Sequence, residues 1–230
     1  MKTPIQAVVD DVMHRRYSCR AYLPTPVPET LIDEILSVAS RAPSGTNTQP
    51  WKVWVVTGES KQRLSEKILA AFNDPEEAAM HSEPYAYYPK KWFSPYIDRR
   101  RTVGLALYKL LGIEKGDSAR MHEQHGKNYQ FFGAPVGLIF TTDSIMEQGS
   151  YIDYGMFLQN IMLAAKARGL DTCLQAAFLQ FHRIVRETLE IPENETVVCG
   201  MALGYGDPQA SENSLRTERA PASEWVSYKD

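Results

Sequence analysis

The chain is poor in cysteine, and its few cysteines form no pattern typical of a disulfide framework or a zinc site. Among 230 residues there are three, Cys19, Cys173 and Cys199, which lie far apart and include no Cys-x-x-Cys pair. An odd number at such spacing argues against both kinds of site. We therefore expect a reducing compartment, the cytoplasm.

Long apolar runs and an excess of basic charge are also absent. No run is long enough to span a bilayer, and residues 1–12 contain Asp10 and Asp11 where a secretory signal needs an apolar core. The formal net charge is −3 and no basic stripe occurs, so we expect neither nucleic acid nor membrane as a partner. With 43% hydrophobic residues, no repeat and no low-complexity linker, the chain is predicted to form one domain.

Motifs of hydrolases, metalloenzymes and dinucleotide-binding folds are missing or incomplete. No Gly-x-Ser-x-Gly elbow and no Walker-type glycine loop occur. His122 and His125 stand three residues apart, whereas the zinc-protease motif needs a spacing of four. Gly204-x-Gly206 follows a predicted strand, but Pro208 stands where a phosphate-binding helix should start. We expect no metal site.

Hydrophobic periodicity predicts a mixture of helices and strands. Apolar residues at helical spacing predict helices over 5–15, 28–41, 59–72, 97–111, 118–130, 151–167 and 178–190. Aromatic and β-branched runs predict strands over 51–57, 135–141, 170–175 and 196–203. The helix over 151–167 is apolar around most of its circumference, so we expect the sheet and a second subunit to cover it.

Two polar segments near the N-terminus carry the most information. Arg16-Tyr17-Ser18-Cys19-Arg20 places two guanidinium groups and a hydroxyl within five residues, which suits a phosphorylated, partly anionic aromatic cofactor. The segment 42–51, Ala-Pro-Ser-Gly-Thr-Asn-Thr-Gln-Pro-Trp, is a turn-rich loop that leads into a strand. Taken singly, the arginines are also typical of a solvated surface, and Pro-Ser-Gly of an ordinary turn.

In this order, separated by one helix, the two segments resemble the nitroreductase family of FMN-dependent oxidoreductases. Three further motifs fall in the family's order, at 132–138, 169–172 and 204–208, and Arg219-Ala220-Pro221 resembles its C-terminal phosphate contact. The resemblance implies an α/β (α+β) fold with a central, mostly antiparallel sheet flanked by helices, in a domain-intertwined homodimer. It also implies a single domain over 1–230, with a lid-like insertion at about 74–130 and a C-terminal tail at about 207–230.

The resemblance implies FMN as the cofactor, bound at the dimer interface. By the same resemblance, Arg16, Arg216 and Arg219 contact the phosphate, and Arg20 lies at the pyrimidine edge, where its charge stabilises the reduced ring. The loop reaches the flavin from the opposite subunit. The predicted cofactor-binding residues are Arg16, Tyr17, Ser18, Arg20, Pro43, Ser44, Gly45, Asn47, Gln175, Ala176, Arg216 and Arg219.

The segment 174–177 corresponds to the family's position beside the flavin N5. Ala176 has no side-chain donor, so we expect a backbone N–H to serve there. In the related iodotyrosine deiodinases a threonine hydroxyl meets N5, an arrangement associated with one-electron steps. Its absence here favours two-electron reduction, and no side chain is an evident acid or base.

The insertion contains six aromatic residues within twelve positions, 85–96, that are broken by prolines. Such density is compatible with a small satellite core and also with a lid that stacks on an aromatic substrate. We predict a lid. The residues expected beside the substrate are Thr46, Tyr88, Trp92 and Phe93.

We therefore predict an FMN-dependent oxidoreductase that uses NAD(P)H to reduce nitroaromatic compounds, with quinones as a second class, by two-electron hydride transfer in a ping-pong cycle. The expected partners are a second copy of the chain and a small aromatic substrate. Three alternatives remain open. They are a reductive dehalogenase of the iodotyrosine deiodinase type, a flavin-cleaving enzyme of cobalamin lower-ligand synthesis, and a flavin-binding module without turnover.

Overall fold

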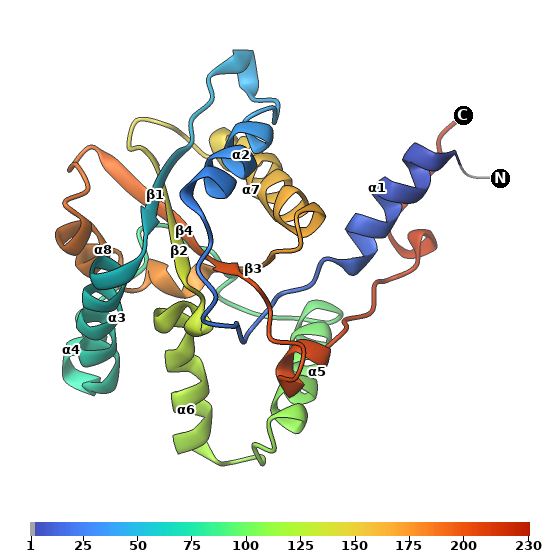
Figure 1. Cartoon of the computed structure of the whole chain (residues 1–230). Helices are drawn as coiled ribbons and strands as arrows, with labels where there is room; N and C mark the ends of the chain where they lie inside the picture. Colours follow the sequence, from blue (N-terminus) through green and yellow to red (C-terminus); the bar gives the residue numbers. More distant parts are fainter. Residues whose placement is uncertain (1–2) are drawn as a thin grey trace.

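The computed structural model describes residues 3–230, which fold around a four-stranded antiparallel sheet (Figure 1). In spatial order the strands are β1 (Lys52–Val56), β2 (Val136–Asp143), β4 (Glu195–Gly204) and β3 (Asp171–Gln175). All four predicted strands are present. The predicted antiparallel sheet flanked by helices is therefore confirmed.

Helices cover both faces of this sheet (Figure 1). One face packs against α2 (Glu29–Ala39) and α7 (Gly149–Ala167). The other packs against α3 (Gly58–Asn73), α8 (His182–Leu189) and the 3₁₀ segment η2 (Lys127–Gly133). Because side chains alternate along a strand, each central strand contributes to two separate cores.

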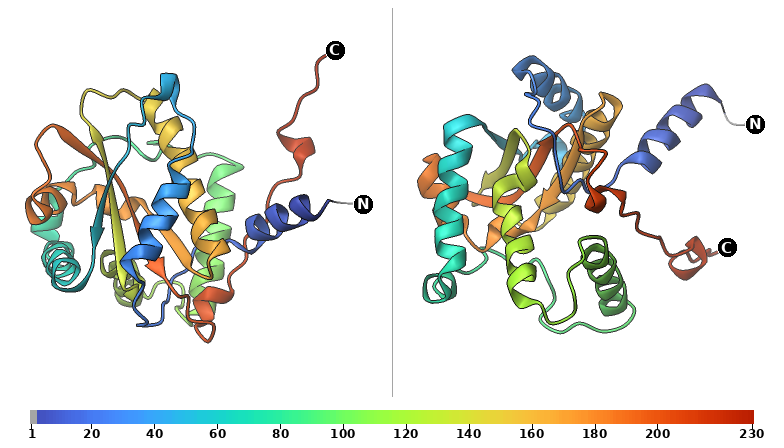
Figure 2. Two further views of the ribbon diagram at one scale, coloured as in Figure 1. Left: turned by 45° about the horizontal axis from the view of Figure 1, so that its top comes forward. Right: turned by 60° about the horizontal axis from the view of Figure 1, so that its bottom comes forward.

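The remaining elements lie outside these layers. They are the helices α1 (Pro4–Arg15), α4 (Pro75–Ala79), α5 (Tyr96–Leu110) and α6 (Ser118–Gly126), and the 3₁₀ turns η1 (Gly45–Asn47), η4 (Ser211–Ser214) and η5 (Ala222–Glu224). A further 3₁₀ turn, η3 (Ala176–Leu179), belongs to the second core through Phe178 and Leu179. Helix α1 and the C-terminal tail extend away from the body in both views of Figure 2. None of the residues of α1 is buried, although Ile5, Val8 and Met13 are apolar.

Within 3–230 we find no helix that combines the length and apolar character of a membrane span.

Two helices predicted as continuous are each divided in the structure. The helix expected over 118–130 ends at Gly126 and continues as η2, in which Phe131 and Phe132 adopt left-handed backbone angles with φ of 53°. The helix expected over 178–190 is likewise divided into η3 and α8. Burial of an aromatic ring contributes about 1.5–3 kcal/mol, which exceeds the roughly 1–2 kcal/mol cost of a left-handed residue. Burial of the rings therefore outweighs the cost of interrupting the helix.

Two glycines make room for these rings. Phe131 and Phe178 stack at 4.7 Å between centroids inside the second core. A Cβ atom added at Gly137 of β2 would lie 2.5 Å from the Phe131 ring, and one at Gly200 of β4 would lie 2.5 Å from the Phe178 ring. Both strands therefore need glycine at these positions for the sheet and rings to pack together.

The ring packing predicts that Gly200→Ala destabilises the protein by about 1–3 kcal/mol, because the extra methyl group overpacks the core. Gly104→Ala, in α5, is the matched control, since no atom lies within 4 Å of its added Cβ. Replacing a helical glycine by alanine should be neutral or stabilising by up to about 1 kcal/mol. Urea unfolding of both variants measures the difference, and equal midpoints would contradict the packing argument.

Candidate functional site

The site begins with an extended N-terminal segment that pairs with the edge of the sheet. Ser18 forms a parallel bridge with Thr172 of β3, and the backbone N–H of Cys19 donates to the Thr172 carbonyl at 3.0 Å. Alternate residues of an extended segment share a face, so Arg16, Ser18 and Arg20 point to one side. Cys19 points to the other side and is fully buried.

The C-terminal tail docks on this segment through Asn213, which is 5% exposed. Its Oδ1 accepts from the backbone N–H of Arg20 at 2.8 Å, and its Nδ2 donates to the carbonyls of Ala21 and Asp207 at 2.8 and 2.9 Å. Each polar atom of the amide thus has a partner, as a buried polar group requires. Sequence reasoning missed Asn213, because an asparagine in an irregular tail has no local signal that distinguishes it from an exposed loop residue.

The docked tail brings arginines from both ends of the chain together. Burial, followed by the charge of Arg219, lowers the pKa of Arg16. The Arg216 guanidinium lies over the Tyr17 ring, 4.2 Å from its centroid, and Arg219 donates to Thr217. Within residues 3–230, no carboxylate forms an ion pair with these arginines.

Repulsion between like charges that have no counter-charge lowers the stability of the fold, and a bound anion relieves it. A dianionic phosphate fits this requirement, because arginine forks bind phosphate oxygens with strong, charge-assisted hydrogen bonds. The residues present thus suit the phosphate of the FMN that the resemblance implies. By contrast, the described residues contain no group of three or more His, Cys, Asp or Glu side chains arranged to hold a metal ion.

Strand β3 leads from this arginine cluster to the predicted flavin-edge residues. Ala176 follows β3 directly and lies about 13 Å along the chain from Thr172, at the rise per residue of a strand. Gln175 is 2% exposed, and its Nε2 donates to the Asn128 carbonyl at 2.6 Å. Its Oε1 has no partner among the residues described. The side chain of Gln175 is thus buried and held by Asn128.

Burial also controls the ionisation of the neighbouring thiol. It raises the pKa of Cys173 to about 11, although the charges of Arg20 and Arg16 act in the opposite direction. Cys173 therefore stays a neutral thiol at physiological pH. Both arginines flank Ser18, whose bridge to Thr172 places the segment beside β3.

The loop over 43–47 lies at the opposite end of α7. The backbone N–H of Gly45 faces the Asp153 carboxylate at 3.3 Å, and Ser44 Oγ accepts from the N–H of Gln49 at 2.9 Å. At the other end of the helix, Lys166 Nζ lies 5.1 Å from the Tyr17 ring centroid. Asp153 and Lys166 are separated by about 20 Å along α7, at the rise of an α-helix. Within one chain, the loop and the arginine cluster therefore do not converge.

The loop presents exposed residues on a constrained backbone. Thr46 and Asn47 have positive φ values of 48° and 61°, and both are exposed, as are Pro43 and Gly45. Left-handed geometry is unusual for a β-branched threonine. The Asp153 contact and the Ser44 turn hold the loop in this conformation.

The aromatic insertion is anchored at its base and open at its tip. Tyr85 donates to the Val198 carbonyl at 2.6 Å and packs against Tyr151. Further along, Tyr88 is 51% exposed and Phe93 is 64% exposed, whereas Trp92 is half-buried. The rings at the tip contact one another but do not enter either core.

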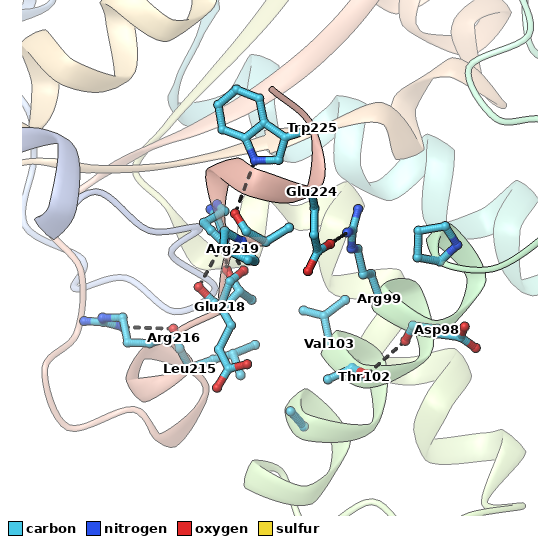
Figure 3. A pocket seen from close by; sticks show the side chains of 15 residues that line it. Asp98, Arg99, Thr102, Val103, Leu215, Arg216, Glu218, Arg219, Glu224 and Trp225 are labelled. Atoms are coloured by element: carbon cyan, nitrogen blue, oxygen red, sulfur yellow. Dashed lines mark hydrogen bonds and ion pairs between the residues drawn. The ribbon is translucent and has the colours of Figure 1, made fainter. Parts of the chain in front are cut away.

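A cavity of about 1180 Å³ joins the insertion to the arginine cluster (Figure 3). Helix α5 forms one wall, and the tail from Leu215 to Trp225 forms the other. Arg216 and Arg219 line it, and an ion pair between Arg99 and Glu224, at 3.0 Å, connects the walls. Residues of the insertion and two predicted phosphate ligands therefore line the same cavity.

Known proteins resemble this chain over almost its whole length. A family model described as the nitroreductase family matches residues 13–205. A 4-nitrobenzoate reductase of Pseudomonas putida is 43% identical over 219 residues, which cover 95% of this chain and 94% of that protein. A nitrobenzene nitroreductase of Ectopseudomonas oleovorans is 37% identical over 225 residues, 98% of each chain. The crystal structure of an FMN and NADPH-dependent nitroreductase, NfnB from Sphigopyxis sp. strain HMH, has a TM-score of 0.92 at 34% identity and covers 96% of this chain and 99% of that chain.

The arginine geometry predicts that Arg219→Gln weakens FMN binding about ten-fold or more, since a hydrogen bond to a charged group contributes roughly 1.5–3 kcal/mol. Arg183→Gln, an exposed arginine of α8 on the far side of the sheet, is the control and should leave the dissociation constant unchanged. Fluorescence titration of apoprotein with FMN measures both. Unfolding of the apoprotein should show no loss of stability in Arg219→Gln, because the removed charge repels Arg16. A less stable apoprotein with unchanged FMN affinity would refute the assignment.

Proposed function

The chain belongs to the nitroreductase family, and we propose from this premise that it is an FMN-dependent oxidoreductase that reduces nitroaromatic compounds with NAD(P)H. The observation that carries the proposal is the cluster of arginines without a carboxylate partner, placed beside β3 by the docked tail. It provides the anion site that the phosphate of FMN needs. The three cysteines are free and buried, which fits the cytoplasmic location that we propose.

Several of the predicted residues have defined tasks in this function. Arg16 and Arg219 bind the phosphate, Ser18 adds a hydroxyl donor, and Arg20 lies where negative charge develops on the reduced ring. When bound, FMN would supply the redox chemistry, the passage of electrons as hydride from NAD(P)H to the nitro compound, while these residues hold and orient it. Ala176 offers its backbone beside the flavin N5 and no hydroxyl. This arrangement favours paired-electron reduction over the dehalogenase alternative.

We propose that the working unit is a homodimer in which the loop over 43–47 completes the partner's site. The separation of the loop from the arginines along α7 supports this arrangement. So does unpaired apolar surface, because Ile5 and Val8 of α1 are 77% and 64% exposed, and Trp225 of the tail is 71% exposed. Extended arms with such residues are stable when a partner covers them.

The tip of the insertion is proposed to act as a lid over the substrate. A satellite core would bury its rings, whereas Tyr88 and Phe93 stay largely exposed. Exposed rings are available to stack on a flat, electron-poor substrate, which contributes about 0.5–1.5 kcal/mol per aromatic pair, and the segment that contains them continues through Pro95 into the wall of the cavity. Thr46 would approach the same substrate from the partner's loop.

The function predicts that the purified, FMN-loaded protein loses its flavin colour under anaerobic conditions on addition of NADPH or NADH. Addition of nitrobenzene or 4-nitrobenzoate should then restore the colour, because the nitro group accepts the electrons. Absorption spectroscopy measures both half-reactions. A flavin-binding module would not bleach with either donor, and a flavin-cleaving enzyme would consume FMN with oxygen instead of cycling it.

The shared site predicts complementation between two variants that are each impaired in FMN binding, assayed at an FMN concentration too low for either variant to be active alone. Arg219→Gln removes a phosphate ligand, and Asn47→Asp removes an amide donor while keeping a residue that tolerates left-handed geometry. Co-expression in equal amounts yields heterodimers with one native site, so about a quarter of the native activity should return. Activity no higher than that of the separate variants would show that both residues serve the same subunit's site.

A further inference from the structure

The relatives act on both charged and neutral nitro compounds, since one is named for 4-nitrobenzoate and another for nitrobenzene. The lid contains a feature that bears on this difference. The guanidinium carbon of Arg100, in α5, lies 4.8 Å from the ring centroid of Trp92 and 5.4 Å from that of Tyr88. The two rings are themselves 5.4 Å apart. Two residues of the lid therefore hold one arginine.

These contacts leave the hydrogen-bonding edge of Arg100 available. Rings attract a guanidinium through its charge and its flat faces, while its five N–H donors lie in the plane of the group. Among residues 3–230, no hydrogen bond or ion pair engages the guanidinium of Arg100, and the residue is exposed. An arginine oriented by rings and unpaired at its edge is prepared to accept a carboxylate in a bidentate manner.

The surroundings favour an anion. From residue 90 to residue 101 the chain contains five basic residues and one acidic residue, Asp98, although its net charge is −3. Only Arg99 of the five forms an ion pair within the described residues, with Glu224. The lid is therefore a locally positive region that attracts anionic ligands.

The position of the lid connects this region to the cofactor site. Arg100 does not itself line the cavity, but its neighbours Asp98 and Arg99 on α5 form the wall that faces Arg216 and Arg219 (Figure 3). Tyr88 contacts Arg100, and part of its ring is also exposed. An aromatic carboxylate could thus stack on a ring of the lid and pair with Arg100 at the same time.

We propose that Arg100, oriented by Tyr88 and Trp92, binds the carboxylate of ring-carboxylated nitroaromatic substrates and makes the enzyme selective for anionic over neutral nitro compounds. The proposal rests on the proposed function and adds its substrate class. Arg100 acts on specificity, and it takes no part in the transfer of hydride.

The first experiment measures binding without turnover. Benzoate and benzamide, which have no nitro group, are titrated into the oxidised, FMN-loaded protein by calorimetry. Arg100→Gln should weaken benzoate binding about ten-fold, as expected for loss of one charge-assisted pair, and leave benzamide binding unchanged. Arg101→Gln removes the same charge from the same helix, but Arg101 lines a separate cavity between α5 and α6. It should alter benzoate binding less than about two-fold.

The second experiment measures selectivity in turnover. Methyl 4-nitrobenzoate is the neutral match for 4-nitrobenzoate, because esterification replaces the negative charge by a methyl group and leaves the ring and the nitro group unchanged. Arg100→Gln should lower kcat/KM for the acid about ten-fold, chiefly through KM, and change that for the ester less than about two-fold. Arg100→Lys should restore part of the loss, since it keeps the charge without the planar fork. Added salt should reduce kcat/KM for the acid more than for the ester.

A third measurement separates the substrate from the phosphates of the electron donor, which are also anions. The rate of flavin reduction by NADPH and by NADH should be the same in Arg100→Gln and the unaltered protein. A slower reduction with unchanged acid-to-ester selectivity would overturn the proposal, as would equal effects of Arg100→Gln and Arg101→Gln on benzoate. If no nitro compound is reduced but Arg100 still controls benzoate binding, the proposed function fails and the carboxylate site stands. FMN content and thermal unfolding of each variant check that it is folded.

Discussion

The amide of Asn213 joins the two ends of the chain, and the placement of the whole site depends on its three hydrogen bonds. Its side-chain oxygen accepts a hydrogen bond from the backbone N–H of Arg20, a residue that lies 193 positions earlier in the sequence. A buried amide that lost one partner would incur a desolvation cost of about 1–3 kcal/mol, so the tail has a single favourable register on the N-terminal segment. That register places Arg219 near Arg16. Charges that repel each other are thus held together by neutral hydrogen bonds.

The rest of the site is distributed over rigid elements that extend from this junction. Strand β3 carries the backbone from Thr172 toward Ala176, while α7 connects the junction to the loop at Gly45 through Lys166 and Asp153. Both elements are paired or packed along their length, so their ends keep fixed separations. The segment proposed as a lid differs from these elements, since its helix α5 has no buried residue over Tyr96–Leu110.

The sequence predicted what depends on local pattern. The strands and the long apolar helix follow from periodicity, and the structure contains them. The roles of the arginines at 16, 20 and 219 come from the resemblance and stay predictions. The division of two helices was not predictable, because it arises from the stacking of Phe131 on Phe178, which are distant in sequence. The partners of Asn213 and Arg100 were missed for the same reason. Each depends on a contact that only the folded chain creates.

The proximity of Arg16 and Arg219 also affects how the protein should be handled. If the proposed phosphate site is correct, any small dianion that binds between these arginines relieves their repulsion, so we expect inorganic phosphate or sulfate to stabilise the cofactor-free chain by mass action and to compete with FMN. Monovalent salt screens the same repulsion without filling the place. We therefore expect two purification buffers of equal pH and ionic strength, one based on phosphate and one on an organic cation, to yield different flavin contents from the same cells.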